Sequence, residues 1–494
     1  MKSSTPIYEV AVILAALVLS VPVFAQSSSS FSPLSNSIST PRPFDPGTNT
    51  TNPSALAVQA QNPFLGSVPT STLMPGILEL SLTDVVNRGL HANLGLIDSE
   101  QDHAQSRAAR LRALSTLLPQ LSAQFAEDFQ NFPVNTIGGQ KLGLPSIVPN
   151  YNYQLASVDY KQKVVDIAAW HEVKAAHAEE AMSSASLADA KNIVVLAATS
   201  AYLQVLASQS RVKAAEAEFA SAQAVESLLR DRVKREVSPE IDAIRATVAR
   251  DSADQRLALA QVRLEKDKLG LTRIIGLPVE QEFTLTTDLG FHDAPEKNLD
   301  TLVQQAAASR QDLKAAEARV EFARQQVKAQ SAQNLPSVEV RANGGEVGVN
   351  FGHVYGNYGI EGQVSVPIFT GRRIEAAVLT ATATLNRRQA EFEDLQQRTK
   401  YDVRSALLDL RAADKSVQVA RTNSSLAEEG LRQAKDRFEA GVSNSLELIQ
   451  AEQAVAAAKD NDIASIYGHN LAKLLLVRSL GTAERDYTTY LGVR

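Results

Sequence analysis

Apolar and small residues recur at alternating spacings of three and four along two long stretches of this chain. The first stretch carries Val194, Ala198, Ala201, Val205, Val212, Phe219, Leu229 and Val233, and the second carries Thr399, Val403, Ala406, Leu410, Val417, Ser424, Ala434 and Phe438. Such spacing is typical of the seam of a coiled coil. The pattern predicts two long helices, each packed against a partner along one face.

The two stretches belong to copies of one unit. Residues 231–238 (DRVKREVS) align with residues 436–443 (DRFEAGVS), and the helical pattern continues on both sides of each segment. An internal repeat of this size indicates a duplicated architecture. The sequence therefore divides into a first repeat over residues 77–284 and a second repeat over residues 285–494.

Each repeat is predicted to contain three helices. They cover residues 82–117, 164–237 and 240–275 in the first repeat, and residues 298–334, 372–440 and 445–480 in the second. A helix of about 70 residues is about 105 Å long at about 1.5 Å per residue. The two shorter helices of a repeat together match the long one, so we expect them to stack end to end beside it.

A change of period follows the first helix of each repeat. Leu118-Pro119 and Leu335-Pro336 end these helices, and apolar residues then alternate with polar ones, as they do in strands. The predicted strands cover residues 119–131, 151–163, 337–349 and 358–369. The fold class is accordingly mainly α with β, with four strands and two long helical hairpins in each chain.

The predicted strands have a length that suits a membrane. Strands of about 10 to 13 residues with one apolar face can cross a bilayer core at a tilt. Unpaired strand edges in lipid cost several kcal/mol per backbone group, and four strands are too few to close a barrel. Several copies of the chain must therefore share one transmembrane barrel. An ordinary two-stranded coiled coil stays open as an alternative for the helices, although it leaves the strands unexplained.

The N-terminal region is typical of an exported protein. Lys2, an apolar run over residues 10–19 and a small-residue cleavage site ending at Ala25 predict a signal peptide over residues 1–25. Residues 26–76 are rich in Ser, Pro and Asn, so we expect a disordered leader there. The sequence has no cysteine, which excludes disulfides, a thiol nucleophile and a lipid-modified cysteine.

Charge and motifs argue against several classes of function. The net charge of -6 is opposite to what nucleic-acid binding requires. The histidines have no metal-ligand spacing, and the sequence contains neither a phosphate-binding loop nor a nucleophile elbow. We therefore predict no enzyme activity, no cofactor, no metal site and no nucleic-acid partner.

Taken in order, these features resemble the TolC-like outer-membrane efflux proteins, or outer membrane factors. The resemblance includes the signal peptide, the duplicated helix-strand-strand-helix-helix unit, the two Leu-Pro junctions, the VPIFTGRR segment at 366–373 and the RFEAGV segment at 437–442. It implies a homotrimer whose strands form one barrel in outer-membrane lipid, continued by a long α-helical barrel across the periplasm of a Gram-negative type bacterium. It also implies docking onto a periplasmic adaptor, or membrane fusion protein, of an inner-membrane transporter.

The resemblance also places a periplasmic entrance at the helical tip of the second repeat. Aligned on Gly441, Ser443 stands where the family has an Arg, Glu447 stands at the first acidic position and Gln450 at the second. Asp242 aligns with Glu447 in the first repeat, so a trimer would bring both acids of every copy near the aperture. Such a ring could favour cations. Alternatively, both acids simply lie at helix starts, where the helix dipole favours them.

The predicted function is the channel component of a tripartite efflux or type I secretion system, acting as a passive exit duct. Adaptor docking is expected at the two tips, through Arg232, Val237, Ser238, Arg437, Gly441 and Val442. The alternatives are a periplasmic adaptor and a secreted coiled-coil structural protein without a pore. The sequence does not predict which solute passes.

Overall fold

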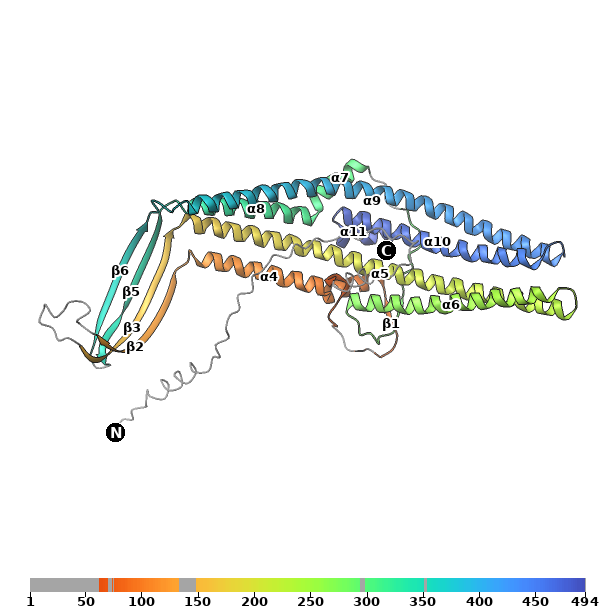
Figure 1. Cartoon of the computed structure of the whole chain (residues 1–494), viewed down its shortest axis with the longest axis horizontal. Coiled ribbons are helices and arrows are strands. Elements are labelled where there is room, and N and C mark those ends of the chain that lie inside the picture. The colour runs from red at the N-terminus through yellow and green to blue at the C-terminus, as the bar shows by residue number, and fades with distance from the viewer. Residues whose placement is uncertain are drawn as a thin grey trace, which may run out of the picture. The chain divides into compact units, whose positions relative to one another are not determined.

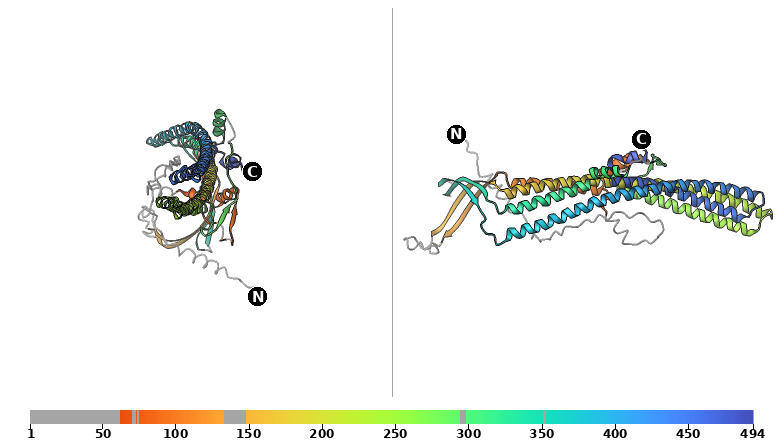
Figure 2. Two further views of the ribbon diagram at one scale, coloured as in Figure 1. Left: turned by 90° about the vertical axis from the view of Figure 1, so that its right-hand side faces the viewer. Right: turned by 90° about the horizontal axis from the view of Figure 1, so that it is seen from above.

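The computed structural model describes residues 62–69, 73, 75–132, 148–293, 298–350 and 353–493, all of which lie in the unit Leu56–Arg494. The predicted signal peptide and residues 26–61 of the predicted leader lie outside the described residues. Within this unit, four strands lie at one end of a layer of long helices and two helical tips lie at the other (Figure 1). Seen along the helices, the layer is curved (Figure 2).

Two helical hairpins form most of this layer. In the first, α5 (Ile167–Lys234) turns into α6 (Glu240–Ile275), and in the second, α9 (Arg373–Glu439) turns into α10 (Ser445–Ser479). These bounds lie within a few residues of the predicted ones. The predicted seam residues of α9 are all buried, since α10, α8 and α7 pack against this helix.

α5 is also the central helix of the chain's hydrophobic core. Among the described residues it is the one helix long and apolar enough to cross a membrane, but 50% of its apolar window is buried inside the chain. Val195, Tyr202 and Leu203 of α5 lie in the largest buried cluster. Its apolar character is therefore explained by packing against other parts of the same chain.

Each of the first helices is interrupted once, which the sequence analysis did not predict. Residues 82–117 form α3 (Leu82–Ala92) and α4 (Leu94–Ser115), and residues 298–334 form α7 (Leu299–Ser309) and α8 (Gln311–Ala332). Asn93 and Arg310 stand at the two interruptions, where ψ is 128° and 123° instead of helical.

Side-chain partners stabilise the two interruptions. The Oδ1 of Asn93 accepts a hydrogen bond from the Gly95 N–H at 3.0 Å, and its Nδ2 donates to the Phe64 carbonyl at 2.8 Å. The guanidinium of Arg310 binds the carboxylates of Asp312 and Asp402 at 2.6 and 3.1 Å. Polar side chains with such partners can leave the helical conformation without unpaired buried groups.

Residues 62–69 form an ordered strap over the first interruption, so the prediction of a disordered leader is wrong for this part. The strap contains η1 (Pro63–Leu65), and its Val68 N–H donates to the Ala92 carbonyl at 2.8 Å. The ring of Phe64 lies so close to Gly95 that an added Cβ would be 2.6 Å away. Apolar side chains of the strap pack against α4 and α5, which provides the burial that the polar leader composition did not suggest.

The expected end-to-end stacking of the shorter helices is visible at two glycines. Gly276, with a φ of 69°, ends α6 against α3, because an added Cβ would lie 2.4 Å from the Cβ of Ala92. Gly481, with a φ of 73°, follows α10, and an added Cβ would lie 2.7 Å from the Cα of Arg310. Glycine allows both the left-handed backbone and the close approach.

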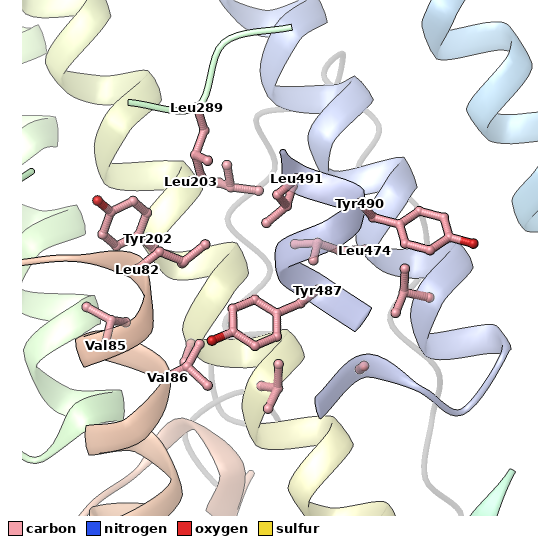
Figure 3. Close-up of a cluster of buried hydrophobic side chains, with 14 of the residues drawn as sticks. Leu82, Val85, Val86, Tyr202, Leu203, Leu289, Leu474, Tyr487, Tyr490 and Leu491 are labelled. Carbon is pink, nitrogen blue, oxygen red and sulfur yellow. The ribbon is translucent and has the colours of Figure 1, made fainter. Parts of the chain in front are cut away.

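The largest buried cluster lies beside these two glycines and includes Leu277 and Leu480. β1 (Leu78–Leu80) pairs in parallel with β4 (Phe283–Leu285), and α11 (Ala483–Leu491) packs on α5 and α10. None of these three short elements was predicted from the sequence. Their side chains meet those of α3 and α5 in one buried cluster, including Tyr202 and Tyr487 (Figure 3).

The four long strands form one antiparallel sheet in the order β2-β3-β5-β6. They are β2 (Gln120–Phe132), β3 (Val148–Val165), β5 (Ser337–Asn350) and β6 (His353–Ser365). The last strand begins before the predicted residue 358 and ends before residue 369, since Pro367 has no N–H to extend the ladder. Within the described residues the sheet is open, with β2 and β6 at its two edges.

The two faces of the sheet differ in polarity. On one face, Leu121, Tyr160, Ala342 and Ile360 form a row across all four strands, and Ile360 is 80% exposed. The neighbouring row on the opposite face contains Lys161, Arg341 and Glu361. The chain therefore presents an uncovered apolar face and a charged face on the same sheet.

Candidate functional site at the helical tips

The tip between α9 and α10 is held together around Glu447. Gly441 has a φ of 75°, and Asn444 caps α10 by accepting a hydrogen bond from the Glu447 N–H at 3.0 Å. The Glu447 carboxylate accepts from the Ser443 hydroxyl at 2.5 Å and pairs with the Arg437 guanidinium at 3.2 Å. Glu447 is therefore oriented by a serine and an arginine of its own hairpin, and its side chain remains 44% exposed.

The tip between α5 and α6 has the same backbone path but a strained residue. Glu236 occupies the place of Gly441 and has a φ of 58°, which costs a non-glycine residue about 1 to 2 kcal/mol. The Val237 N–H donates to the Arg232 carbonyl at 2.9 Å, as the Val442 N–H does to the Arg437 carbonyl at 3.0 Å. The two tips thus share one turn geometry. Only the first tip carries the conformational cost of a non-glycine residue with a positive φ.

Polar and aromatic contacts join the two tips to each other. The Ser445 hydroxyl donates to the Asp242 carboxylate at 2.6 Å, and Arg245 lies 3.7 Å from the same carboxylate. The Arg232 guanidinium lies 4.4 Å from the centre of the Phe438 ring and donates to the Phe438 carbonyl at 3.4 Å. These contacts connect α5 and α6 of the first hairpin to α9 and α10 of the second.

A small hydrophobic cluster supports these contacts. It consists of Leu229, Ala246, Phe438 and Leu448, all nearly fully buried. Beside it, the buried Glu226 carboxylate pairs with Arg230 at 2.7 Å and accepts a hydrogen bond from the Thr247 hydroxyl at 2.9 Å. The tip region thus has its own core, separate from the largest cluster.

The structure brings together most of the predicted entrance residues. Asp242, Ser443 and Glu447 take part in the tip contacts, whereas Gln450 is exposed on α10 and joins none of them among the described residues. Sequence reasoning missed Ser445 and the role of Phe438. The seam pattern already contained Phe438, but no sequence signal marked Ser445.

The predicted docking residues lie on both tips. Val237 and Val442 are 65% and 69% exposed, so two apolar side chains project from corresponding turns. Arg232 and Arg437 have partners within the chain, one on the ring of Phe438 and the other on Glu447. The two valines are therefore exposed apolar side chains through which the tips can contact another molecule.

A second group of buried charges lies on α10, near the largest core. The Lys473 ammonium is fully buried and donates to the His292 carbonyl at 3.0 Å. Burial lowers the pKa of Lys473 to about 8, although Asp414 and Asp293 act in the opposite direction. Burial also lowers the pKa of His469, whose Nε2 lies 2.6 Å from the Asp414 carboxylate. No cluster of metal-ligating side chains occurs in the described ranges.

Comparison with known proteins shows which proteins this chain is similar to. A model of the family described as outer membrane efflux protein matches residues 302–482. The pyoverdine export outer membrane protein OpmQ of Pseudomonas putida is 24% identical over 290 residues, which are 57% of this chain and 60%, less than two thirds, of OpmQ. The probable efflux pump outer membrane protein TtgC of that species is 21% identical over 413 residues, 82% of this chain and 83% of TtgC. The Campylobacter jejuni CmeC outer membrane channel has the same fold, with a TM-score of 0.72, 15% identity and coverage of 87% and 94%.

The fold and these relatives define the class of protein: the chain is an outer-membrane channel protein similar to the TolC-like proteins, with its helical part in the periplasm. The match to the outer membrane efflux protein family covers residues 302–482, which lie in the second repeat. The predicted resemblance, localisation and channel role are confirmed. The two alternatives, a periplasmic adaptor and a coiled coil without a pore, are wrong, and the family forms ducts rather than enzymes.

Proposed function

We propose that three copies of this chain form one exit duct, with a shared barrel in the outer membrane and an entrance at the helical tips. The duct docks onto a periplasmic adaptor of an inner-membrane pump, which supplies the energy of transport. The observation that carries this proposal is the open sheet, whose edge strands β2 and β6 have no second neighbour among the described strands.

The two faces of the sheet support a barrel in lipid. Tyr358 and Ile360 are 88% and 80% exposed on the apolar face, a large exposure for such side chains in water. The opposite face, with Lys161, Arg341 and Glu361, suits a water-filled lumen. An open sheet edge in a bilayer would leave backbone groups unpaired, so the edges of neighbouring copies must pair.

The helices support closure in the same way. α6 packs on α5, α5 on α10 and α10 on α9, so α6 and α9 are the outer helices of the layer near the tips. Both carry exposed apolar residues, including Ile244 and Val248 on α6 and Tyr401 and Leu408 on α9. Packing α6 of one copy against α9 of the next buries both sets and continues the curve of the layer.

At the entrance, Glu447 and Asp242 supply carboxylates from each copy. In a ring of three copies these acids surround the aperture, and a ring of carboxylates favours cations. Val237 and Val442 project from the same end and form the apolar contacts of adaptor docking. Arg232, Ser238, Arg437 and Gly441 shape the turns that present them.

Reconstitution of the full-length protein in planar bilayers tests this function. We expect a detergent-extracted trimer that remains intact on unheated electrophoresis and conducts ions with a preference for cations. Glu447→Gln should reduce that preference, whereas Glu393→Gln, an exposed acid of α9 away from the tips, should leave it unchanged. A water-soluble monomer without channel activity would refute the duct, and unchanged selectivity in Glu447→Gln would remove Glu447 from the aperture.

A further inference from the structure

An ion pair inside the chain joins the two hairpins where the last turn of α10 lies against α5. The Arg478 guanidinium of α10 contacts the Asp189 carboxylate of α5 through both of its terminal nitrogens, at 2.9 and 3.0 Å. The side chains are 21% and 12% exposed. A two-point contact of this kind fixes both the distance and the orientation of the helices that carry it.

The duplication repeats both partners. When residues 231–238 are aligned with residues 436–443, Asp189 of α5 corresponds to Asp394 of α9, and Arg478 of α10 corresponds to Arg273 of α6. Both residue types are therefore kept in the other copy. Asp394 and Arg273 are exposed, and neither side chain forms an ion pair within the part of the chain that the structure describes.

Apolar residues on the same helices, between the pair and the tips, show the same relation. Leu474 on α10 is 2% exposed, whereas its counterpart Leu269 on α6 is 47% exposed. Leu203 on α5 is 3% exposed, whereas its counterpart Leu408 on α9 is 57% exposed. The surfaces that meet between α5 and α10 inside the chain thus have counterparts on α9 and α6 that none of the described residues covers.

We infer that Arg273 of one copy pairs with Asp394 of the next, repeating between subunits the contact that Arg478 and Asp189 make within one chain. This inference rests on the proposed trimer and adds the register of its helical interface. The occupant of the α9 surface is a second copy of this chain. The ion pair sets the height at which α6 lies against α9, while Leu269 and Leu408, both on the tip side of the pair, supply buried area.

Chemical cross-linking tests the register in the full-length protein, because the sequence has no cysteine. Arg273→Cys with Asp394→Cys should give covalent trimers with a short bismaleimide whose span matches an arginine side chain. The matched control is Arg273→Cys with Arg387→Cys, since residue 387 is also exposed on α9 but lies about 10 Å further along the helix. It should give markedly less cross-linked product.

Charge reversal provides a second, independent readout. Arg273→Asp or Asp394→Arg alone should shorten the lifetime of the trimer in detergent about tenfold, because like charges would then face each other across the interface. The double reversal should restore the wild-type lifetime. Reversal of both charges with no rescue would overturn the pairing.

The outcomes separate this inference from the proposed function. If the protein is a trimer but cross-links through the control pair in place of residues 273 and 394, the register is wrong and the duct stands. If the wild-type protein is a monomer, the duct itself fails, and the inference fails with it.

Discussion

The contact between the two tips depends on Phe438, and its removal should separate them. Phe438 is 3% exposed, packs with Leu229, Ala246 and Leu448, and lies under the Arg232 guanidinium. Truncation of a buried Phe to Ala costs about 3 to 5 kcal/mol, and the cation-π contact adds about 0.5 to 1 kcal/mol. Because the tip cluster is separate from the largest core, we expect the loss to act on the tips rather than on the whole fold.

A loss of about 3 kcal/mol raises the population of separated tips roughly a hundredfold, because each 1.4 kcal/mol is about a factor of ten. Under the proposed function, Phe438→Ala should therefore conduct more than the wild-type protein in planar bilayers. Hydrogen exchange should become faster in residues 229–248 and 436–449, while exchange around the largest core stays the same. Both measurements use the intact trimer.

Val442→Ala is the matched control for this experiment. Val442 lies on the same tip but is 69% exposed, so its truncation removes little packing. It should conduct and exchange like the wild type, although we expect weaker adaptor docking. The reasoning would be refuted by a Phe438→Ala protein with wild-type conductance and wild-type exchange at the tips.

Other substitutions test individual features of the fold. Glu236→Gly should keep the stability of the first tip or raise it by up to about 1 kcal/mol, measured by hydrogen exchange, because glycine adopts a φ of 58° without strain. Gly95→Ala should weaken the strap by about 1 to 3 kcal/mol, because its Cβ would lie 2.6 Å from the ring of Phe64. Limited proteolysis should then cut the strap faster, and Gly270→Ala, whose Cβ would meet nothing within 4 Å, should not have this effect. Lys473→Met should abolish a pH dependence of the free energy of unfolding. In the folded state the pKa of Lys473 is about 8, below the ordinary 10.5, so between these values the folded state binds fewer protons than the unfolded state. The wild type should therefore gain stability as pH rises through that window. If thermal unfolding shows the same slope of stability against pH in the variant, Lys473 is not the cause of the dependence.

The long elements could be predicted because their patterns extend over many turns. The seam of α9 repeats from Thr399 to Phe438, so a single atypical residue such as Ser424 does not obscure it. The strands were recognisable from alternation after the Leu-Pro junctions. The pairing of β2 with β3 and of β5 with β6 also follows from order along the chain, since hairpins place consecutive strands together. The pairing of β3 with β5 joins the two repeats and does not follow in this way.

The interruptions at Asn93 and Arg310 could not be predicted in the same way. Each consists of one residue with an extended backbone, and the helical periodicity on both sides is undisturbed. What stabilises them is distant in sequence: the Phe64 carbonyl for Asn93, and the Asp402 carboxylate for Arg310. A local pattern contains no information about such partners.

The candidate site could be predicted only in part, because some of its contacts join residues that are distant in the sequence. The resemblance to the family identified Glu447, and alignment of the two repeats added Asp242, because both stand at the same place after a turn. The partner of Glu447, Arg437, depends on how α9 and α10 pack at one tip, and the partner of Asp242, Ser445, depends on how the two tips approach each other. Side chains that meet only across two hairpins leave no periodic signal in either one.

The edge strands β2 and β6 have a genetic consequence under the proposed trimer. A copy with a damaged β2 can still join a trimer through its intact β6. The trimer that contains it then cannot close its barrel. If damaged and normal copies mix randomly in equal amounts, roughly one eighth of the rings contain three normal copies. Alleles that disrupt one edge strand should therefore be dominant when expressed beside the normal gene, whereas alleles that prevent folding altogether should be recessive.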